Sequence, residues 1–359
     1  MVKKVLIALL IVLALLILVV GSYVAYLLID FHRIADDQAL TASTAGATAL
    51  PAGEELRIVS WNIGFGAYSA DYSFFMDGGT ESRAFSKEAC EENVNAVIAK
   101  LTDWNADLML VQEVDFDSTR SYRIDQRQMI EAAFPEYSAV FAQNYDSSYL
   151  FYPVTKPIGA SKSGILTLSS AQIGDAVRRS LPIEGGINKF FDLDRCYSVS
   201  SIPVDDGKTL KLYNLHLSAY SSDGSIATEQ LALMAQEMAA DYAAGNYVIA
   251  GGDFNKDLWG DSSAYSGVSG VDASWCKPFP TELVPEGFTL VNTLDEANLV
   301  LSSRNTDTAY EKGRTFEVTL DGFIVSDNVQ VNSCAIVDTA YAKTDHNPVD
   351  MRFVLRDGN

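Results

Sequence analysis

The sequence predicts an α/β domain over residues 56–359, preceded by one N-terminal transmembrane helix. Between residues 56 and 355, apolar runs with strand propensity alternate with amphipathic helical patterns, and hairpin-like pairs of runs also occur. The chain has 359 residues, of which 48% are hydrophobic. That is enough to bury the core of one large domain or of two small ones.

The N-terminal element is an almost unbroken apolar run, Val5–Ile29, of about 25 residues, which is long enough to cross a bilayer as a helix. Lys3 and Lys4 precede it, so the positive-inside rule places the N-terminus in the cytoplasm and the rest of the chain outside. We therefore expect a single-pass protein of the cell membrane. The alternative is a cleaved signal peptide, but the small-residue site Ala45-Gly46-Ala47 lies far downstream of the apolar run.

Residues 39–55 follow the anchor and are rich in Ala, Thr, Ser and Gly, which is typical of a flexible tether. The predicted organisation is a cytoplasmic tip (1–4), a transmembrane anchor (5–29), a flexible linker (30–55) and a catalytic domain (56–359).

The first half of the domain is predicted to begin with a strand and a Gly- and aromatic-rich loop. Ser86 is then a plausible N-cap for a helix, because apolar residues recur with helical spacing at Val94, Val97, Ile98 and Leu101. The other elements expected here are the strands Leu56–Trp61, Leu108–Gln112 and Lys162–Leu168 and a helix over Gln126–Phe134.

The second half is predicted to contain a hairpin that turns at Asp205-Asp206-Gly207 and a long variable stretch over residues 256–309. We expect the variable stretch to shape substrate choice. The other expected elements are the strands Thr209–Leu217, Tyr247–Ala250, Thr315–Val325, Asn328–Val337 and Val349–Leu355 and a helix over Ser225–Tyr242.

Charge and cysteine content exclude some classes of function. The formal net charge of -21 repels polyanions in general and argues against broad, tight binding of DNA or RNA. The four cysteines contain no C-x-x-C pair, so a zinc module is not expected, whereas disulfides stay open. There are only three histidines, His32, His216 and His346.

Six short polar motifs lie at or near the ends of apolar, strand-like runs. In chain order they are Trp61-Asn62, Gln112-Glu113, Asn214-Leu215-His216-Leu217, Gly252-Asp253-Phe254-Asn255, Leu320-Asp321 and Thr344-Asp345-His346-Asn347-Pro348. In content and order they resemble the pattern of the endonuclease/exonuclease/phosphatase superfamily, over roughly residues 56–355. One departure is the run Trp61-Asn62-Ile63-Gly64, which lacks the acidic residue that abasic-site nucleases carry two positions after the asparagine.

The resemblance implies a four-layer α/β sandwich, in which two mixed sheets pack face to face with helices outside. It also implies a hydrolase of phosphate esters that uses Mg²⁺, with Mn²⁺ as a substitute. The expected metal-binding residues are Asn62, Glu113 and Asp345, because Mg²⁺ prefers oxygen ligands and keeps several waters, and a contact with the phosphate is the alternative role of Asn62.

The resemblance assigns the catalytic roles as follows. Asp253 orients or deprotonates the attacking water, and Asn255 and His216 contact phosphate oxygens. Asp321 holds the imidazole of His346, which as a histidinium stabilises the transition state, although a role for this histidine as the base stays open. Arg120, Arg123 and Lys162 are weaker candidates for contacts with the substrate, since solvated charges are the ordinary reading of such residues.

Three substrate classes stay open for a membrane-tethered, extracytoplasmic phosphodiesterase or phosphatase. They are a phospholipid head group, a soluble phosphoester and, for a nuclease, extracellular nucleic acid. The tether and the acidic charge favour the first two. A binding module that keeps the fold without the chemistry is the alternative of another class, but the six filled motifs argue against it. No protein partner is implied.

Overall fold

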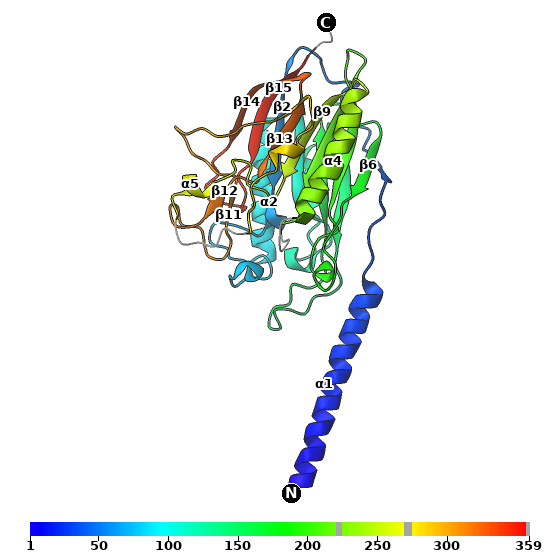
Figure 1. The fold of residues 1–359 in the computed structure, drawn as a ribbon, viewed down its shortest axis with the longest axis vertical. Helices are drawn as coiled ribbons and strands as arrows, with labels where there is room; N and C mark the ends of the chain where they lie inside the picture. Colours follow the sequence, from blue (N-terminus) through cyan, green and yellow to red (C-terminus); the bar gives the residue numbers. More distant parts are fainter. Residues whose placement is uncertain (220–224, 269–274, 357–359) are drawn as a thin grey trace.

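The computed structural model describes residues 1–219, 225–268 and 275–356, and within them two large mixed sheets lie face to face (Figure 1). The six-stranded sheet consists of β2 (Glu55–Asn62), β3 (Leu108–Asp115), β4 (Ser138–Asp146), β5 (Lys162–Ser169), β14 (Val329–Ile336) and β15 (Val349–Leu355). Its order is β14-β15-β2-β3-β5-β4, and only β2 and β3 run parallel within it.

The second sheet has seven strands in the order β1-β6-β7-β8-β9-β13-β10. They are β1 (Gln38–Leu40), β6 (Ala176–Ser180), β7 (Cys196–Pro203), β8 (Thr209–His216), β9 (Tyr247–Asp253), β10 (Phe288–Leu290) and β13 (Asp321–Ser326). Only β8 and β9 run parallel here, so each sheet has one parallel pair near its centre.

Helices cover the outer faces of both sheets. The helices α2 (Lys87–Trp104) and α3 (Gln126–Ala133) pack on the six-stranded sheet, and α4 (Ser225–Ala243) packs on the seven-stranded sheet (Figure 1). The inner faces meet in an apolar core that includes Ile58, Leu110, Leu212, Ile249 and Phe353. The predicted four-layer sandwich is confirmed.

The predicted start of the first domain helix is also confirmed. The Ser86 side chain accepts a hydrogen bond from the backbone N–H of Ala89, as an N-cap residue does. Val94, Val97 and Leu101 are buried against the sheet because helical spacing places them on one face of α2.

The N-terminal helix α1 (Val2–Asp30) is longer than the predicted anchor at both ends. It is long and apolar enough to cross a membrane, and its most hydrophobic window is not buried by the rest of the chain. Its last turns contact the described part of the domain, where Leu27 is buried. The chain therefore enters the domain at a defined place rather than on a loose tether.

The structure differs from the prediction of a flexible linker over residues 30–55. Strand β1 pairs with β6 and extends the seven-stranded sheet, while Leu50 is buried in the core between the sheets. The small residues allow close approach: Gly46 has φ +101°, and a Cβ there would lie 2.8 Å from the carbonyl carbon of Ala171. Composition suggested flexibility, but the same small side chains let this segment lie against the sheet edges.

Replacing Leu50 by alanine should destabilise the domain by about 2–5 kcal/mol, because the change leaves a cavity in the core. Chemical denaturation of the variant measures this free energy of unfolding. A flexible linker would instead tolerate the change with no measurable loss of stability.

The predicted single strand over Thr315–Val325 is wrong, because the chain divides into β12 (Glu317–Val318) and β13. Strand β12 pairs with β11 (Ser303–Arg304) in a separate small sheet. The variable stretch 256–309 also contains α5 (Ser263–Ser266), and its residues 269–274 lie outside the described part of the chain. All four cysteines are free.

Candidate active site

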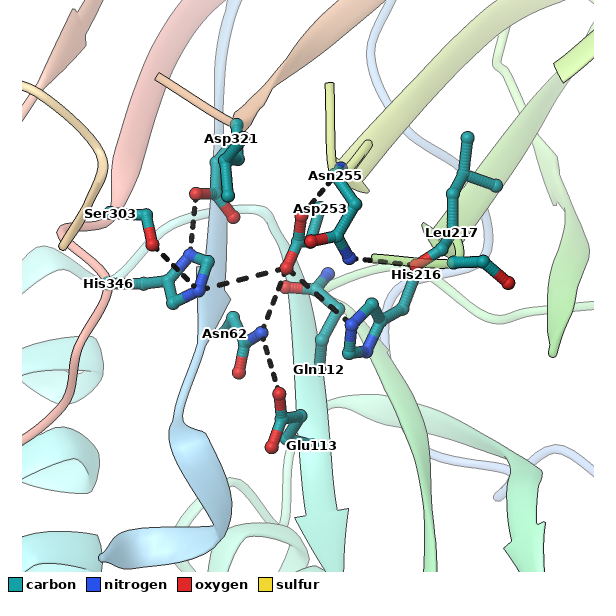
Figure 2. A network of polar contacts seen from close by, with 12 residues as sticks. Asn62, Gln112, Glu113, His216, Leu217, Asp253, Asn255, Ser303, Asp321 and His346 are labelled. Carbon is teal, nitrogen blue, oxygen red and sulfur yellow. Dashed lines mark hydrogen bonds and ion pairs between the residues drawn. The ribbon is translucent and has the colours of Figure 1, made fainter. Parts of the chain in front are cut away.

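The parallel strand pairs of the two sheets end at one edge of the sandwich, and most of the predicted site residues lie there (Figure 2). Asn62 ends β2 and pairs in register with Gln112 of β3, directly before Glu113. In the other sheet, His216 of β8 pairs in register with Asp253 of β9. Strand order and register thus bring together side chains that are far apart in the sequence.

Irregular backbone at these strand ends helps to aim the side chains. Glu113 has φ +55° inside a β-bulge of β3, and Asn255 has φ +49° directly after β9. Left-handed φ values are unfavourable for residues other than glycine and are concentrated at functional sites. Gly252 has φ +144°, and a Cβ there would lie 2.1 Å from the carbonyl oxygen of Leu215, so only glycine fits.

His346 and Asp321 form the closest charged pair of the site. The His346 Nδ1 lies 2.7 Å from an Asp321 carboxylate oxygen, and both side chains are buried. Burial opposes protonation, but the charge of Asp321 and this hydrogen bond outweigh it and hold the pKa of His346 well above its ordinary value. This environment therefore favours the imidazolium form of the ring.

Two serines that the sequence reasoning missed orient this pair. The Ser302 hydroxyl donates to Asp321 at 2.7 Å, and the Ser303 hydroxyl lies 3.2 Å from His346 Nε2. Both come from the variable stretch, where no motif distinguishes a serine that reaches the site from one in a loop.

Asp253 occupies the centre of the cluster. Its Oδ1 accepts a hydrogen bond from the backbone N–H of Asn255, and its Oδ2 accepts one from Asn62 Nδ2 at 3.1 Å. The same Oδ2 lies 3.6 Å from His216 Nε2 and 3.8 Å from His346 Nε2. Burial and the charge of Asp321 raise the pKa of Asp253 above the usual carboxylate range.

His216 differs in protonation from His346, although both rings face the same carboxylate. Burial and the positive charge of Arg195 hold the pKa of His216 well below its ordinary value. Its Nδ1 has no hydrogen-bond partner among the described residues. A neutral ring with a free nitrogen can make one more hydrogen bond, whereas the charged ring of His346 supplies a positive charge.

Carboxylates form the part of the site that suits a cation. Glu113 and Asp345 line the cavity together with Asp253. Burial and the charge of Glu113 raise the pKa of Asp345 in spite of the opposing charge of His346. Asp253, Asp321 and His346 also place possible ligand atoms within 4.8 Å of one another, but the Asp321–His346 hydrogen bond already uses one atom of each.

The structure does not support Asn62 as an oxygen ligand in this arrangement. Its Oδ1 accepts a hydrogen bond from the backbone N–H of Gly64 at 3.0 Å, while its Nδ2 donates to Glu113 and Asp253 at 3.1 Å each. The amide therefore holds the two carboxylates at fixed positions.

Other motif residues connect the two sheets. Gln112 Nε2 donates to Asn214 Oδ1 at 2.8 Å across the sandwich, and Asn214 Nδ2 donates to the carbonyl oxygen of Leu166. Trp61 Nε1 donates to the carbonyl oxygen of His346, which holds the histidine segment against β2. These side chains keep the strand ends, and with them the catalytic candidates, at constant separation.

Of the three weaker candidates, the structure places only Arg120 at the cavity. Its guanidinium donates two hydrogen bonds to Asp115 and lies 3.8 Å from the ring centre of Phe65. Arg123 is wrong as a candidate here, because its exposed side chain pairs with Asp117. Lys162, which begins β5 and pairs in register with Asp146 of β4, does not line the cavity either.

The cavity has a volume of about 620 Å³, and two arginines that the sequence reasoning did not assign, Arg195 and Arg304, line it. Arg195 is only 2% exposed, and its Nε and Nη2 donate to Asp192. Its Nη1 has no partner among the described residues. The sequence does not show that Arg195 faces a cavity, because a single arginine before a predicted strand belongs to no motif and the cavity forms only in the folded chain.

Comparisons with known proteins agree with this geometry. Residues 59–346 match the Endonuclease/Exonuclease/phosphatase family. A comparison with curated protein sequences found no match.

Three solved structures illustrate the similarity of fold. The endonuclease/exonuclease/phosphatase of Beutenbergia cavernae DSM 12333 aligns with TM-score 0.57 and 14% identity, over 84% of this chain and 72% of that chain. The protein from Bacteroides vulgatus aligns with TM-score 0.55 and 16% identity, over 84% and 100%. The 2',3'-cyclic phosphatase ANGEL2, solved with adenosine-2',3'-vanadate, gives 0.55 and 13%, over 88% and 98%.

The family match spans most of the chain and includes the segments that carry the clustered histidines and carboxylates, and the neighbouring structures share the sandwich fold. The chain therefore belongs to the endonuclease/exonuclease/phosphatase family.

Proposed function

We propose that this chain is a metal-dependent phosphoesterase, tethered to the cell membrane by α1 with its domain outside the cytoplasm. The observation that carries the proposal is the placement of one carboxylate, Asp253, between two buried histidines with opposite pKa shifts. Groups whose environments push their pKa values apart are typical of acid–base sites. Lys3 and Lys4, on the N-terminal side of the apolar run, support the orientation.

In the proposed reaction, Asp253 accepts a proton from the attacking water and holds it in line with the phosphorus. His346, charged and held by Asp321, stabilises the negative charge that develops on the phosphoryl oxygens. Neutral His216 donates a hydrogen bond to another phosphoryl oxygen. Asn255 Nδ2 donates a hydrogen bond to the carbonyl oxygen of Leu217, so the main role of Asn255 is to hold the turn beside Asp253 in place.

The donor set fits a hard divalent cation such as Mg²⁺. Glu113, Asp345 and Asp253 provide carboxylate oxygens to one cavity. Burial is the main cause of the raised pKa values of Asp253 and Asp345, and the charge of Glu113 adds to that of Asp345, so a nearby cation would favour the ionised forms of these carboxylates. A bound Mg²⁺ ion neutralises charge on the phosphoryl group. Glu113 and Asp345 would hold it, and Asn62 would orient Glu113.

Glu113→Gln keeps the shape of the side chain but removes its charge, so the variant should need about tenfold or more Mg²⁺ for half-maximal rate. Titration of the rate with Mg²⁺ and with Mn²⁺ measures this change. The folded state should be about as stable as the wild type, because the change removes one charge from a crowded carboxylate cluster. An unaltered metal dependence would remove Glu113 from the metal site.

Arg195→Ala should raise KM for the phosphoester by about tenfold, because the Arg195 Nη1 is a guanidinium donor of the cavity that has no partner among the described residues. Arg195→Lys should recover part of this loss, since the charge stays although the fork of donors is lost. Steady-state kinetics of the two variants separates KM from kcat. If Arg195 serves only to hold Asp192, both variants should lose kcat equally, and KM should not change.

The activity itself is tested on the purified full-length protein in detergent, with and without Mg²⁺. The substrates are an aryl phosphodiester, sphingomyelin, inositol phosphates, a 2',3'-cyclic nucleotide and plasmid DNA. Metal-dependent turnover of at least one of them is expected. Because the net charge of -21 opposes binding of a long polyanion, plasmid DNA should be the poorest substrate, and efficient cleavage of DNA would favour the nuclease alternative.

A further inference from the structure

We propose that the mouth of the cavity rests on the membrane that α1 crosses, and that the substrate is a phosphoester in the head group of a lipid of that membrane. The surface that would touch the membrane consists of three segments, residues 75–77, 149–158 and 187–191, which we call the rim loops. The substrate class rests on the phosphoesterase function proposed above, whereas the contact with the membrane is independent of it.

The first argument is the distribution of exposed apolar side chains. Among the described residues that follow α1, nine large hydrophobic side chains are exposed, and six of these lie in the rim loops. Val154 is 83% exposed, Ile187 70% and Tyr152 68%. Such a concentration at one place marks a surface that meets another molecule or a lipid phase. The six residues are Met76, Phe151, Tyr152, Val154, Ile187 and Phe191.

The second argument identifies the lipid phase as the partner, because the rim loops contact the end of the membrane helix. Tyr23 of α1 donates through its hydroxyl to the carbonyl oxygen of Tyr149, and its ring lies 4.9 Å from that of Phe151. The hydroxyl of Tyr26 accepts a hydrogen bond from the backbone N–H of Tyr149. Figure 1 shows α1 leaving the domain at the end from which these loops project.

The third argument concerns the depth of the rim loops relative to the bilayer. A hydrocarbon core of about 30 Å takes about 20 helical residues at 1.5 Å each, and counting these from Val5 places the outer boundary near Val24. Tyr23 and Tyr26 then lie at the level where aromatic side chains are enriched in membrane proteins. Phe151, in ring contact with Tyr23, must lie at the same level.

The same apolar cluster continues from α1 into the wall of the cavity. Leu27 at the end of α1 is buried in one cluster with Phe74, Ile158 and Tyr68, and these three residues line the cavity. Met76 and Phe191 of the rim loops also line it. A lipid that enters past the rim would therefore meet apolar side chains first and the histidines and carboxylates behind them. A phospholipid has the same arrangement, with its apolar acyl chains in the membrane and its phosphate group outside the hydrocarbon core.

Electrostatic attraction is not expected to hold the rim loops on the membrane. The net charge of -21 opposes contact with anionic lipids. Lys156 of the rim pairs with Glu81, and the Lys189 ammonium lies over the rings of Phe31 and Phe190. Insertion of apolar side chains is the remaining driving force, so the contact should not depend on anionic lipid.

The depth of the rim is measured on the full-length protein in phosphatidylcholine vesicles that contain lipid brominated near the glycerol end of the acyl chains. The probe is the added tryptophan of Val154→Trp, and the matched control is Leu299→Trp, an exposed apolar position outside the rim loops. The added tryptophan at 154 should be quenched at least about threefold more strongly than that at 299. Equal quenching at the two positions overturns the contact with the membrane, whatever the enzyme hydrolyses.

The substrate class is tested with Val154→Asp/Ile187→Asp, which places two charges on the rim without touching the catalytic residues. Hydrolysis of phosphatidylcholine or sphingomyelin in vesicles should fall about tenfold or more, and hydrolysis of a soluble aryl phosphodiester should stay within about twofold. The control Leu233→Asp/Leu299→Asp should alter neither rate. Equal loss on both substrates, or no loss on lipid, overturns the proposed role of the rim.

The two proposals fail in different ways. Metal-dependent turnover of the soluble diester without turnover of either vesicle lipid rejects the lipid substrate and leaves the phosphoesterase function standing. Absence of turnover on every substrate, with strong quenching at position 154, rejects the phosphoesterase function and leaves the membrane contact standing.

Discussion

Replacing His346 by alanine should lower kcat by about two to four orders of magnitude, the usual range for a charged group that stabilises the transition state. The loss is expected because the imidazolium supplies positive charge at a buried site, where water cannot replace it. His32→Ala is the matched control, since the His32 side chain is exposed and does not line the cavity. Rates per folded molecule, from activity and circular dichroism on the same samples, separate lost chemistry from lost folding.

Asp321→Asn should also lower kcat, and the double variant should lose far less than the product of the single losses because the pair acts as a unit. Asp321 raises the pKa of His346, and the active form carries the proton, so the wild-type rate falls as the pH rises through that raised value. Without the carboxylate charge the pKa of His346 falls, and the loss should begin at lower pH. Multiplicative losses, or full activity in His346→Ala, would reject the catalytic pair.

The second large effect is expected for Asp253→Asn, which should lower kcat by about three orders of magnitude. The amide cannot accept the proton of the attacking water. It has nearly the size of the carboxylate, but its NH₂ group cannot accept one of the two hydrogen bonds that Asn62 and the backbone of Asn255 donate to Asp253. In the wild type the rate should fall as the pH drops through the raised pKa of Asp253, because the base must be deprotonated.

The residual rate of Asp253→Asn should lack this acid limb of the pH profile. Asp205→Asn serves as control, because Asp205 caps the backbone of Ala52 away from the cavity. If Asp253→Asn keeps both its rate and the acid limb of its pH profile, another residue must be the base.

Most of the site residues could be predicted from the sequence because they lie at the ends of predicted strands. Apolar runs that end in Asn62, Glu113, His216 and Asp253 could be recognised along the chain, because strand propensity and short motifs are local properties. Parallel neighbours within a sheet end at the same edge, so the meeting of these residues followed from the predicted fold.

Interactions between distant residues could not be read in this way. The composition of residues 30–55 is that of a tether, yet Leu50 lies in the core, because burial depends on which sheet edges are free to receive the segment. Arg123 and Arg120 are similar by sequence and only three positions apart. The backbone turn at residues 119–121 directs one guanidinium to the buried Asp115 and the other to the solvent.

The sequence by itself determined an N-terminal helix long and apolar enough to cross a membrane, the sandwich and the identities of the clustered histidines and carboxylates, because hydrophobic patterns and motif order are local properties of the chain. Only the tertiary structure decided that the pKa of His216 is lowered and that of His346 raised, since these shifts depend on burial and on the positions of Arg195 and Asp321. It also decided that the rim loops lie beside the end of α1, which requires contacts between segments more than 100 residues apart. Local patterns select residues, and the packing of distant segments sets their charge, their partners and the direction in which the cavity opens.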